Sequence, residues 1–101
     1  MEISVKSKGR CMEIYLKGEL DHHGAKGMMM RLDRELELAL PLQLVLDFGG
    51  VAFMDSSGIA LILRSQQRMQ LLDGSLMVCN VPPQARRVLD AAGIGRLVHI
   101  K

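Results

Sequence analysis

The chain opens with two stretches in which apolar and polar residues alternate. The apolar members are Met1, Ile3 and Val5 in the first stretch and Met12, Ile14 and Leu16 in the second. Because successive side chains of a strand point to opposite faces, each stretch predicts a half-buried strand. Gly9, in the SKGR segment between them, accepts a left-handed backbone, so the two strands are expected to form a hairpin.

Helical spacing begins after this hairpin. Between Gly24 and Leu40 the apolar residues recur three or four positions apart, which predicts a helix that Pro41 ends. Residues 42–48 (LQLVLDF) are then almost continuously apolar, as in an internal strand of a parallel sheet. Gly49 and Gly50 are expected to loosen the chain after that strand.

A second helix is predicted from Ser57 to Leu72, ended by Asp73 and Gly74. The residues expected on its core face are Gly58, Ile62, Ser65, Met69 and Leu72.

The last part of the chain repeats the alternation of strand and helix. SLMVC predicts a strand, NVPPQARRVLDAAG a third helix, and RLVHI a final strand. The residues of the third helix expected to face inward are Ala85, Val88, Leu89 and Ala92. The order β-β-α-β-α-β-α-β predicts an α/β fold with a mainly parallel central sheet and an N-terminal hairpin.

Composition narrows the class of protein. The 101 residues suffice for one compact domain, 1–101, and 49% of them are hydrophobic. A net charge of only +2, one Tyr, two Phe and no Trp argue against nucleic acid as the main partner. No apolar run reaches the length of a membrane span and no signal peptide is evident, so a cytoplasmic protein is expected. Cys11 and Cys79 are expected to be free thiols, and neither a metal site nor a cofactor is indicated.

Two polar loops are expected to meet at the carboxyl edge of the sheet. GELDHH carries Asp21, and GGVAFMDSSG carries Asp55, Ser56 and Ser57. In open α/β sheets, sites tend to lie outside the carboxyl ends of the strands. If the strands that precede these loops are parallel neighbours, Asp21 and Ser56 lie near each other.

The stretch FMDSSGIA, residues 53–60, has a structural and a regulatory interpretation. Asp55 or Ser56 is a good helix N-cap. A cap alone does not explain Gly58, which is a poor helix former and suggests that a partner or another loop comes close to the backbone. A serine at a helix N-terminus can also carry a phosphate, because the unpaired N–H groups and the helix dipole favour negative charge there.

An enzymatic interpretation uses the same serine. Ser56 with His22 or His23, and with Asp21 or Asp55, is the residue set of a serine hydrolase. The chain has no Gly-x-Ser-x-Gly elbow, and nothing in it indicates an oxyanion hole. If the two histidines take no part in a catalytic site, they are expected to lie in a solvated loop.

The second helix also suggests a surface for a partner. Residues 59–63 form a continuous apolar run that is wider than one core-facing stripe. Ile59 or Leu61 is therefore expected to face outward at least in part, either as an anchor for a partner or under a neighbouring loop.

These segments resemble the anti-sigma factor antagonists of the STAS domain family, in particular its sporulation branch. GELDHH, FMDSSGIA and the C-terminal stretch from GSLMVC to RLVHI carry the resemblance, which covers essentially the whole chain. The resemblance implies a STAS fold and a regulator rather than an enzyme. Such a protein, when unphosphorylated, binds an anti-sigma factor that is also an ATP-dependent serine kinase, and binding releases the sigma factor.

The resemblance also implies roles for single residues. Ser56, directly after Asp55, matches the serine whose phosphorylation ends binding, and Ser57 is its neighbour on the helix side. Asp21 matches the acid that contacts the acceptor hydroxyl, and Ile59 matches a position in the kinase-binding surface. A PP2C-like serine phosphatase, itself metal-dependent, restores the active form. A partner-switching module of another circuit, such as a stress response, is the alternative within the family.

Overall fold

The N-terminal alternation forms an antiparallel hairpin in a computed structural model, which describes residues 1–101. Strand β1 spans Glu2–Lys8 and β2 spans Cys11–Leu20. Gly9 between them has a φ of 60°, in the left-handed region that glycine enters at little cost. Val5 pairs with Ile14, so the apolar sides of both strands face the same way and the predicted hairpin is confirmed.

The helices of the structure begin within three residues of their predicted starts. Helix α1 spans His22–Ala39, α2 spans Ser56–Leu71 and α3 spans Pro83–Ala91, followed by a short 3-10 helix, η1, at Ile94–Arg96. Helix α1 starts before the predicted Gly24 because Asp21 caps it, which brings His22 and His23 into its first turn. The expectation that the histidines lie in a loop is therefore wrong.

Strand β3 differs most from its prediction. It spans Gln43–Met54 and continues through Gly49 and Gly50 instead of ending at Phe48. A Cβ on Gly50 would lie 2.7 Å from the Leu16 carbonyl oxygen, so glycine allows β3 to lie closely along β2 at this point. The register of the β2–β3 pair shifts in the same region. The glycines therefore belong to an irregular strand rather than to a loose loop.

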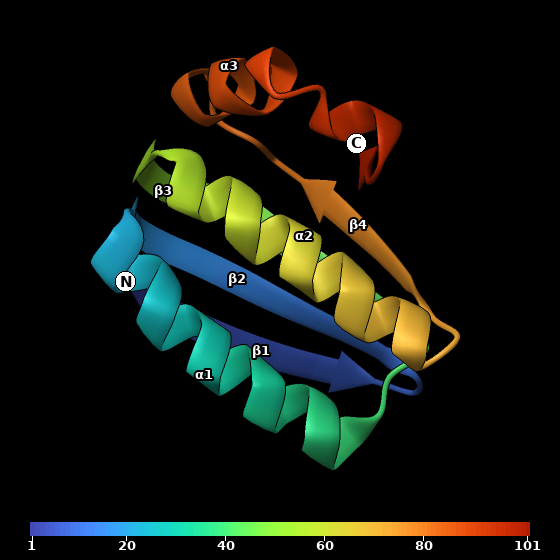
Figure 1. Cartoon of the computed structure of the whole chain (residues 1–101). Coiled ribbons are helices and arrows are strands. Elements are labelled where there is room, and N and C mark those ends of the chain that lie inside the picture. The colour runs from blue at the N-terminus through green and yellow to red at the C-terminus, as the bar shows by residue number, and fades with distance from the viewer.

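The sheet has five strands in the order β1-β2-β3-β4-β5, parallel except for the hairpin (Figure 1). Strand β4 spans Ser75–Cys79, as predicted, whereas β5 is only His99–Ile100 because η1 takes up part of the predicted strand. Cys11 and Cys79 are free thiols at the ends of β2 and β4. The predicted α/β fold with a mainly parallel sheet is confirmed.

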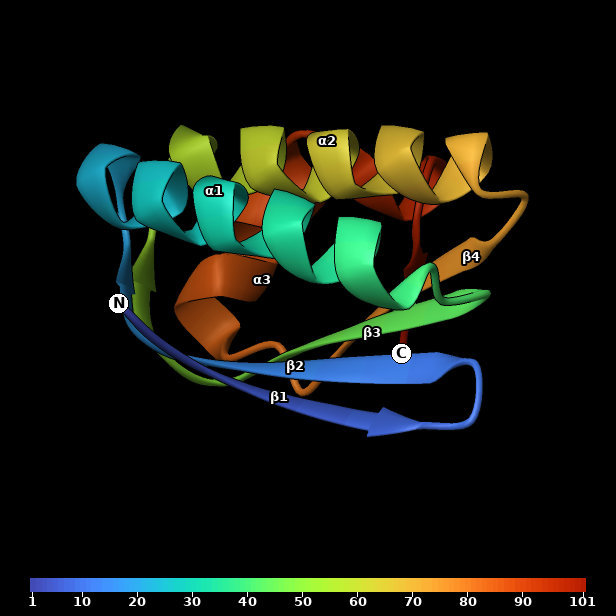
Figure 2. The same ribbon diagram turned by 90° about the horizontal axis from the view of Figure 1, so that it is seen from below.

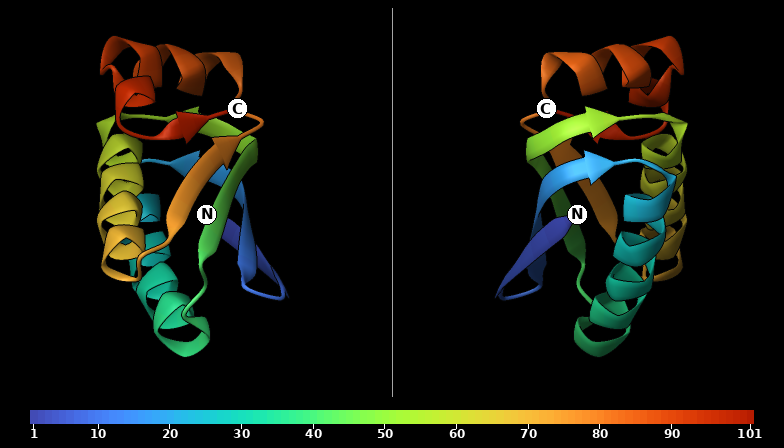
Figure 3. Two further views of the ribbon diagram at one scale, coloured as in Figure 1. Left: turned by 90° about the vertical axis from the view of Figure 1, so that its right-hand side faces the viewer. Right: turned by 90° about the vertical axis from the view of Figure 1, so that its left-hand side faces the viewer.

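The core lies between the helices and one face of the sheet. Figure 2 shows α1 and α2 side by side over that face, and Figure 3 shows α3 beside the C-terminal end of β3. In the second helix four of the five predicted core residues are buried, and only Leu72 is half-buried; the buried four are Gly58, Ile62, Ser65 and Met69. In the third helix Ala85 and Leu89 are buried, Val88 is half-buried and Ala92 is exposed, because α3 ends at Ala91 and its last turn leaves the core.

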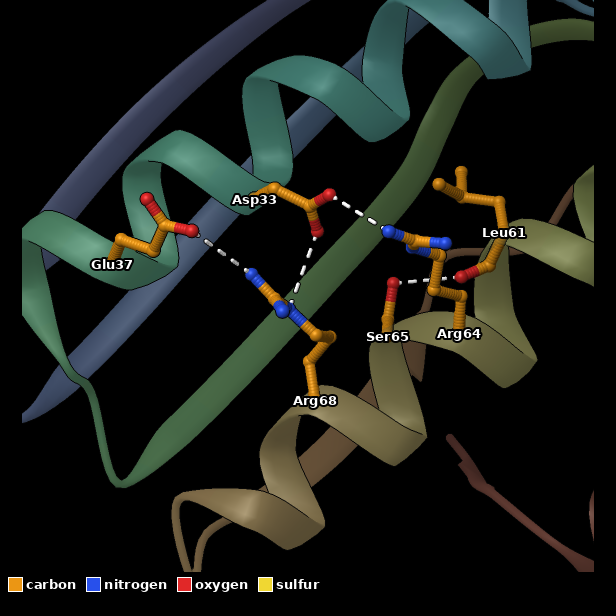
Figure 4. Close-up of polar contacts among 6 residues, drawn as sticks. All are labelled: Asp33, Glu37, Leu61, Arg64, Ser65 and Arg68. Carbon is orange, nitrogen blue, oxygen red and sulfur yellow. Dashed lines mark hydrogen bonds and ion pairs between the residues drawn. The ribbon is translucent and has the colours of Figure 1, made fainter.

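Ion pairs join α1 to α2 along their solvent side (Figure 4). The Asp33 carboxylate lies 3.0 Å from Arg64 and 3.3 Å from Arg68, and Arg68 also lies 3.5 Å from Glu37. Below them, the buried Ser65 hydroxyl donates a hydrogen bond to the Leu61 carbonyl within α2. The two helices are thus held side by side, and both begin at the same end of the sheet (Figure 1).

Candidate functional site

The segments DHHG (21–24) and DSSG (55–58) begin α1 and α2 at one edge of the sheet, here called the capped edge. Strands β2 and β3 are parallel neighbours, and their last paired residues are Leu20 and Met54. The Asp55 amide donates to the Leu20 carbonyl at 3.4 Å, directly before Asp21. The expectation that the segments of Asp21 and Ser56 converge at the carboxyl edge is confirmed.

Each helix at the capped edge has an aspartate as its N-cap. Asp21 Oδ1 accepts a hydrogen bond from the Gly24 amide at 2.8 Å, and Asp55 Oδ1 accepts one from the Ser57 amide, also at 2.8 Å. These bonds satisfy N–H groups that the first turn of a helix leaves without an internal partner. The cap of α2 is therefore Asp55, and Ser56 is the first residue of the helix.

Ser56 is exposed, and its hydroxyl makes no hydrogen bond within the protein. The resemblance implied that Asp21 contacts this hydroxyl, but the structure contains no hydrogen bond between them. Asp21 Oδ1 is instead turned toward the Gly24 amide of its own helix. A second reactant can therefore reach the Ser56 oxygen without breaking an internal contact.

Ser57 and Ile59 border two different grooves. Ser57 is half-buried and lines a groove of about 340 Å³ between α1 and α2, together with His22, Lys26 and Arg64. Ile59, also half-buried, lines a groove of about 550 Å³ between α2 and α3. Ser56 directly precedes Ser57 at the start of α2 and lines neither groove.

Gly58 does not leave space for a partner. Gly58 is buried, and a Cβ built on it would lie 2.4 Å from Met54 Cγ and 3.1 Å from Leu20 Cδ2. The close approach that the sequence indicated is between α2 and the ends of the two strands. Gly24 holds the equivalent place in α1, where a Cβ would lie 2.4 Å from the Glu19 carbonyl oxygen.

Leu61 is fully buried, with 0% of its surface exposed, so the expectation that it contributes to a partner surface is wrong. It lies one helical turn before the buried Ser65, on the face of α2 that packs against the sheet. Of the two candidates, only Ile59 lies at the surface.

The hydrolase interpretation requires a hydrogen bond between Ser56 and a histidine. His22 and His23 are exposed in the first turn of α1, and neither is hydrogen-bonded to Ser56. No group of three or more His, Cys, Asp and Glu side chains lies close enough to share a metal ion.

A residue that sequence reasoning missed, Gln84, binds the backbone directly before the capped edge. Its Oε1 accepts from the Met54 amide at 2.9 Å, and its Nε2 donates to the Met54 carbonyl at 2.8 Å. Gln84 lies in the first turn of α3, 30 positions further along the chain. No spacing or motif in the sequence indicates such a pairing.

The two side chains with displaced pKa values lie on strands, away from the capped edge. Burial raises the pKa of the Cys79 thiol, and the negative charge of Asp47 adds to that rise. A hydrogen bond to Glu13 raises the pKa of Tyr15. Neither group takes part in the contacts of the capped edge.

The model of the STAS domain family matches residues 2–101. The chain belongs to the STAS domain family. An anti-sigma F factor antagonist of Paenibacillus polymyxa is 30% identical over 100 residues, which cover 99% of this chain and 86% of the relative. A second such antagonist, of Lysinibacillus sphaericus, is 29% identical over 82 residues, covering 81% of this chain and 70% of the relative.

Solved structures of this STAS family agree with the architecture of the chain. The unphosphorylated form of the anti-sigma factor antagonist SpoIIAA superimposes with a TM-score of 0.84 at 25% identity, covering 99% of this chain and 88% of that one. The phosphorylated form of SpoIIAA from Bacillus gives a TM-score of 0.75, also at 25% identity, covering 99% and 91%. None of the three helices is both long and apolar enough to cross a bilayer.

Proposed function

We propose that this STAS protein is an anti-sigma factor antagonist that is switched off by phosphorylation of Ser56. The observation that carries the proposal is the exposed Ser56 hydroxyl, without an internal partner, at the first position of a capped helix. The antagonists of Paenibacillus polymyxa and Lysinibacillus sphaericus, and the phosphorylated form of SpoIIAA, support it by similarity.

The partner is an anti-sigma factor that is also a serine kinase. Unphosphorylated, the antagonist binds it and releases a sporulation sigma factor in the cytoplasm. In the kinase reaction the Ser56 oxygen attacks the γ-phosphorus of ATP, the bond from that phosphorus to the β–γ bridging oxygen breaks, and ADP leaves. The hydroxyl proton passes to a base or to water. A PP2C-like phosphatase later reverses the modification by transferring the phosphoryl group to water.

The expected partner surface surrounds Ser56. It includes Asp21 and Ser57 at the capped edge and Ile59 in the groove between α2 and α3. Gly58 and Leu61 support this surface from the core side and do not contact the partner.

Phosphorylation is expected to block the partner rather than unfold the protein. A phosphate adds about −1.5 to −2 charges at neutral pH. The helix N-terminus favours such charge by about 0.3–1 kcal/mol, and the neighbouring Asp21 and Asp55 carboxylates oppose it. In the complex, however, burial of the phosphate is unfavourable, and about 2.7 kcal/mol weakens binding a hundredfold.

The test is to incubate the protein with ATP and a candidate anti-sigma factor kinase of the same organism, and to locate the phosphate by mass spectrometry. We expect modification of Ser56 alone. Ser56→Ala should bind the kinase like the unmodified protein and remain unphosphorylated, and Ser56→Asp should bind at least about tenfold more weakly, a loss of about 1.4 kcal/mol. Ser57→Ala is the matched control and should still be phosphorylated.

Two results would contradict the proposal. One is phosphate on a serine other than Ser56, or no phosphate at all. The other is tight binding by Ser56→Asp, which would exclude the blocking mechanism.

A further inference from the structure

At its C-terminal end, strand β3 extends several residues beyond its pairing with the neighbouring strand β4. Strand β4 pairs with β3 only from Gln43 to Asp47, whereas β3 runs to Met54. On this side the last part of β3 therefore has no strand to bind its backbone. Met54 itself has 0% of its surface exposed, so water cannot serve as the partner of its amide and carbonyl groups.

Gln84 takes the place of the missing strand. A carboxamide is both donor and acceptor, and Gln84 uses both functions on one residue, accepting from Met54 N–H at 2.9 Å and donating to Met54 C=O at 2.8 Å. A glutamate could not donate at neutral pH, and a methionine could do neither. The pair of bonds fixes the peptide groups on both sides of Met54.

This clamp acts two residues before Ser56. The Met54 carbonyl belongs to the peptide that joins it to Asp55, and the Asp55 side chain caps α2 through the Ser57 amide. The Met54–Asp55 peptide, from which Asp55 and Ser56 leave the strand, is therefore held from both sides: by the Leu20 carbonyl of β2, which accepts from the Asp55 amide at 3.4 Å, and by Gln84 of α3. Gln84 also lines the groove between α2 and α3 that Ile59 borders, so it connects that groove to the start of α2.

We propose that Gln84 is a positioning residue that holds the Met54–Asp55 backbone so that the Ser56 hydroxyl is presented to the phosphoryl donor. The functional part of this inference rests on the proposed function of Ser56. The clamp itself is a property of the backbone and can be measured without any partner.

The first experiment measures amide hydrogen exchange by NMR in Gln84→Met, which keeps the length of the side chain and removes both hydrogen bonds. We expect the Met54 amide to exchange about fivefold to tenfold faster than in the original chain. Gln66→Met is the matched control, because Gln66 also donates its Nε2 to a backbone carbonyl, that of Leu97, at 3.1 Å and away from the capped edge. This control should leave Met54 unchanged.

The second experiment measures phosphorylation of both variants by the kinase named above. If Gln84 positions Ser56, kcat falls about fivefold in Gln84→Met while KM is nearly unchanged, because the partner still binds and the acceptor is held less well. A rise in KM alone would overturn the inference, since it would make Gln84 a direct contact of the partner.

Gln84→Glu gives an independent check if Gln84→Met folds poorly. Its carboxyl can donate to the Met54 carbonyl only when protonated, so the Met54 carbonyl carbon shift should return toward that of the original chain as the pH falls below about 4.3. A shift that does not change with pH, or unaltered exchange of Met54 in Gln84→Met, would overturn the clamp. If the clamp is confirmed and Ser56 is never phosphorylated, the proposed function fails and the clamp stands.

Discussion

Helices α1 and α2 begin with the same pattern, DHHG in one and DSSG in the other. In both, the aspartate is an N-cap with an extended backbone, and its carboxylate accepts from an amide of the first turn. In both, the fourth residue is a buried glycine that lets the helix start close to the strand ends. The starts of α1 and α2 therefore share their backbone architecture.

They differ in the two residues between cap and glycine. In α1 these are two exposed imidazoles, and in α2 they are the hydroxyls of Ser56 and Ser57. The shared residues are needed to begin a helix at this edge, and they carry no information about chemistry. The function proposed here therefore depends on Ser56 and Ser57. The following variants test the shared aspartates and glycines separately from these serines.

The largest effect is expected from the glycine at the start of α1. Gly24→Ala would place a Cβ 2.4 Å from the Glu19 carbonyl oxygen, a backbone atom that cannot move aside. We expect a loss of about 1–3 kcal/mol in the free energy of unfolding, measured by urea titration. Gly58→Ala should lose less, because its obstacle is the flexible side chain of Met54.

Gly27 provides the control for this pair. It lies in the same helix as Gly24, and nothing lies within 4 Å of a Cβ built on it. Gly27→Ala should raise stability by up to about 1 kcal/mol through helix propensity. Equal stabilities of Gly24→Ala and Gly27→Ala would show that the start of α1 is not tightly packed.

The hydrophobic pattern sufficed to predict the hairpin, the three helices and β4, because each has the period of its element over several residues. It also predicted the first half of β3, in residues 42–48, but not the continuation to Met54, because Gly49 and Gly50 have low strand propensity. The strand continues there because of a tertiary contact, since only a residue without a side chain fits beside the Leu16 carbonyl of β2. The residues around Gly50 in the sequence do not indicate that Leu16 lies next to it.

For the site, the parallel arrangement of β2 and β3 was enough to bring Asp21 and Ser56 to one edge. Helical spacing alone places Gly58 on the core face of α2, together with Ile62, Ser65 and Met69, and all four are buried. The apolar run 59–63 does not show whether Leu61 joins that face, and the structure shows that it does. Gln84 was missed because its partner, Met54, is 30 positions away in the sequence.

The caps of α1 and α2 should be equivalent. Asp21→Ala and Asp55→Ala each remove one side-chain bond to a first-turn amide, and each is expected to cost about 0.5–2 kcal/mol of unfolding free energy. Asp21→Asn and Asp55→Asn keep an acceptor oxygen and should lose less. Thermal unfolding of the four variants measures this, and a cost for only one of the two alanine variants would show that the two helices do not share their capping.

The smallest effect on stability, and the sharpest test of the difference, comes from a negative charge at the first position of each helix. In His22→Asp and Ser56→Asp the favourable interaction with the helix N-terminus, about 0.3–1 kcal/mol, is opposed by the adjacent cap aspartate. Both variants should therefore unfold within about 1 kcal/mol of the original chain, and any difference should shrink at high salt. Ser56→Asp should lose binding to the anti-sigma factor kinase by at least about tenfold, and His22→Asp should lose less. Equal losses of binding in the two variants would show that the block is not specific to Ser56, because any negative charge on the capped edge would weaken binding. Marked destabilisation of Ser56→Asp would show that phosphorylation unfolds the start of α2 rather than blocking the partner.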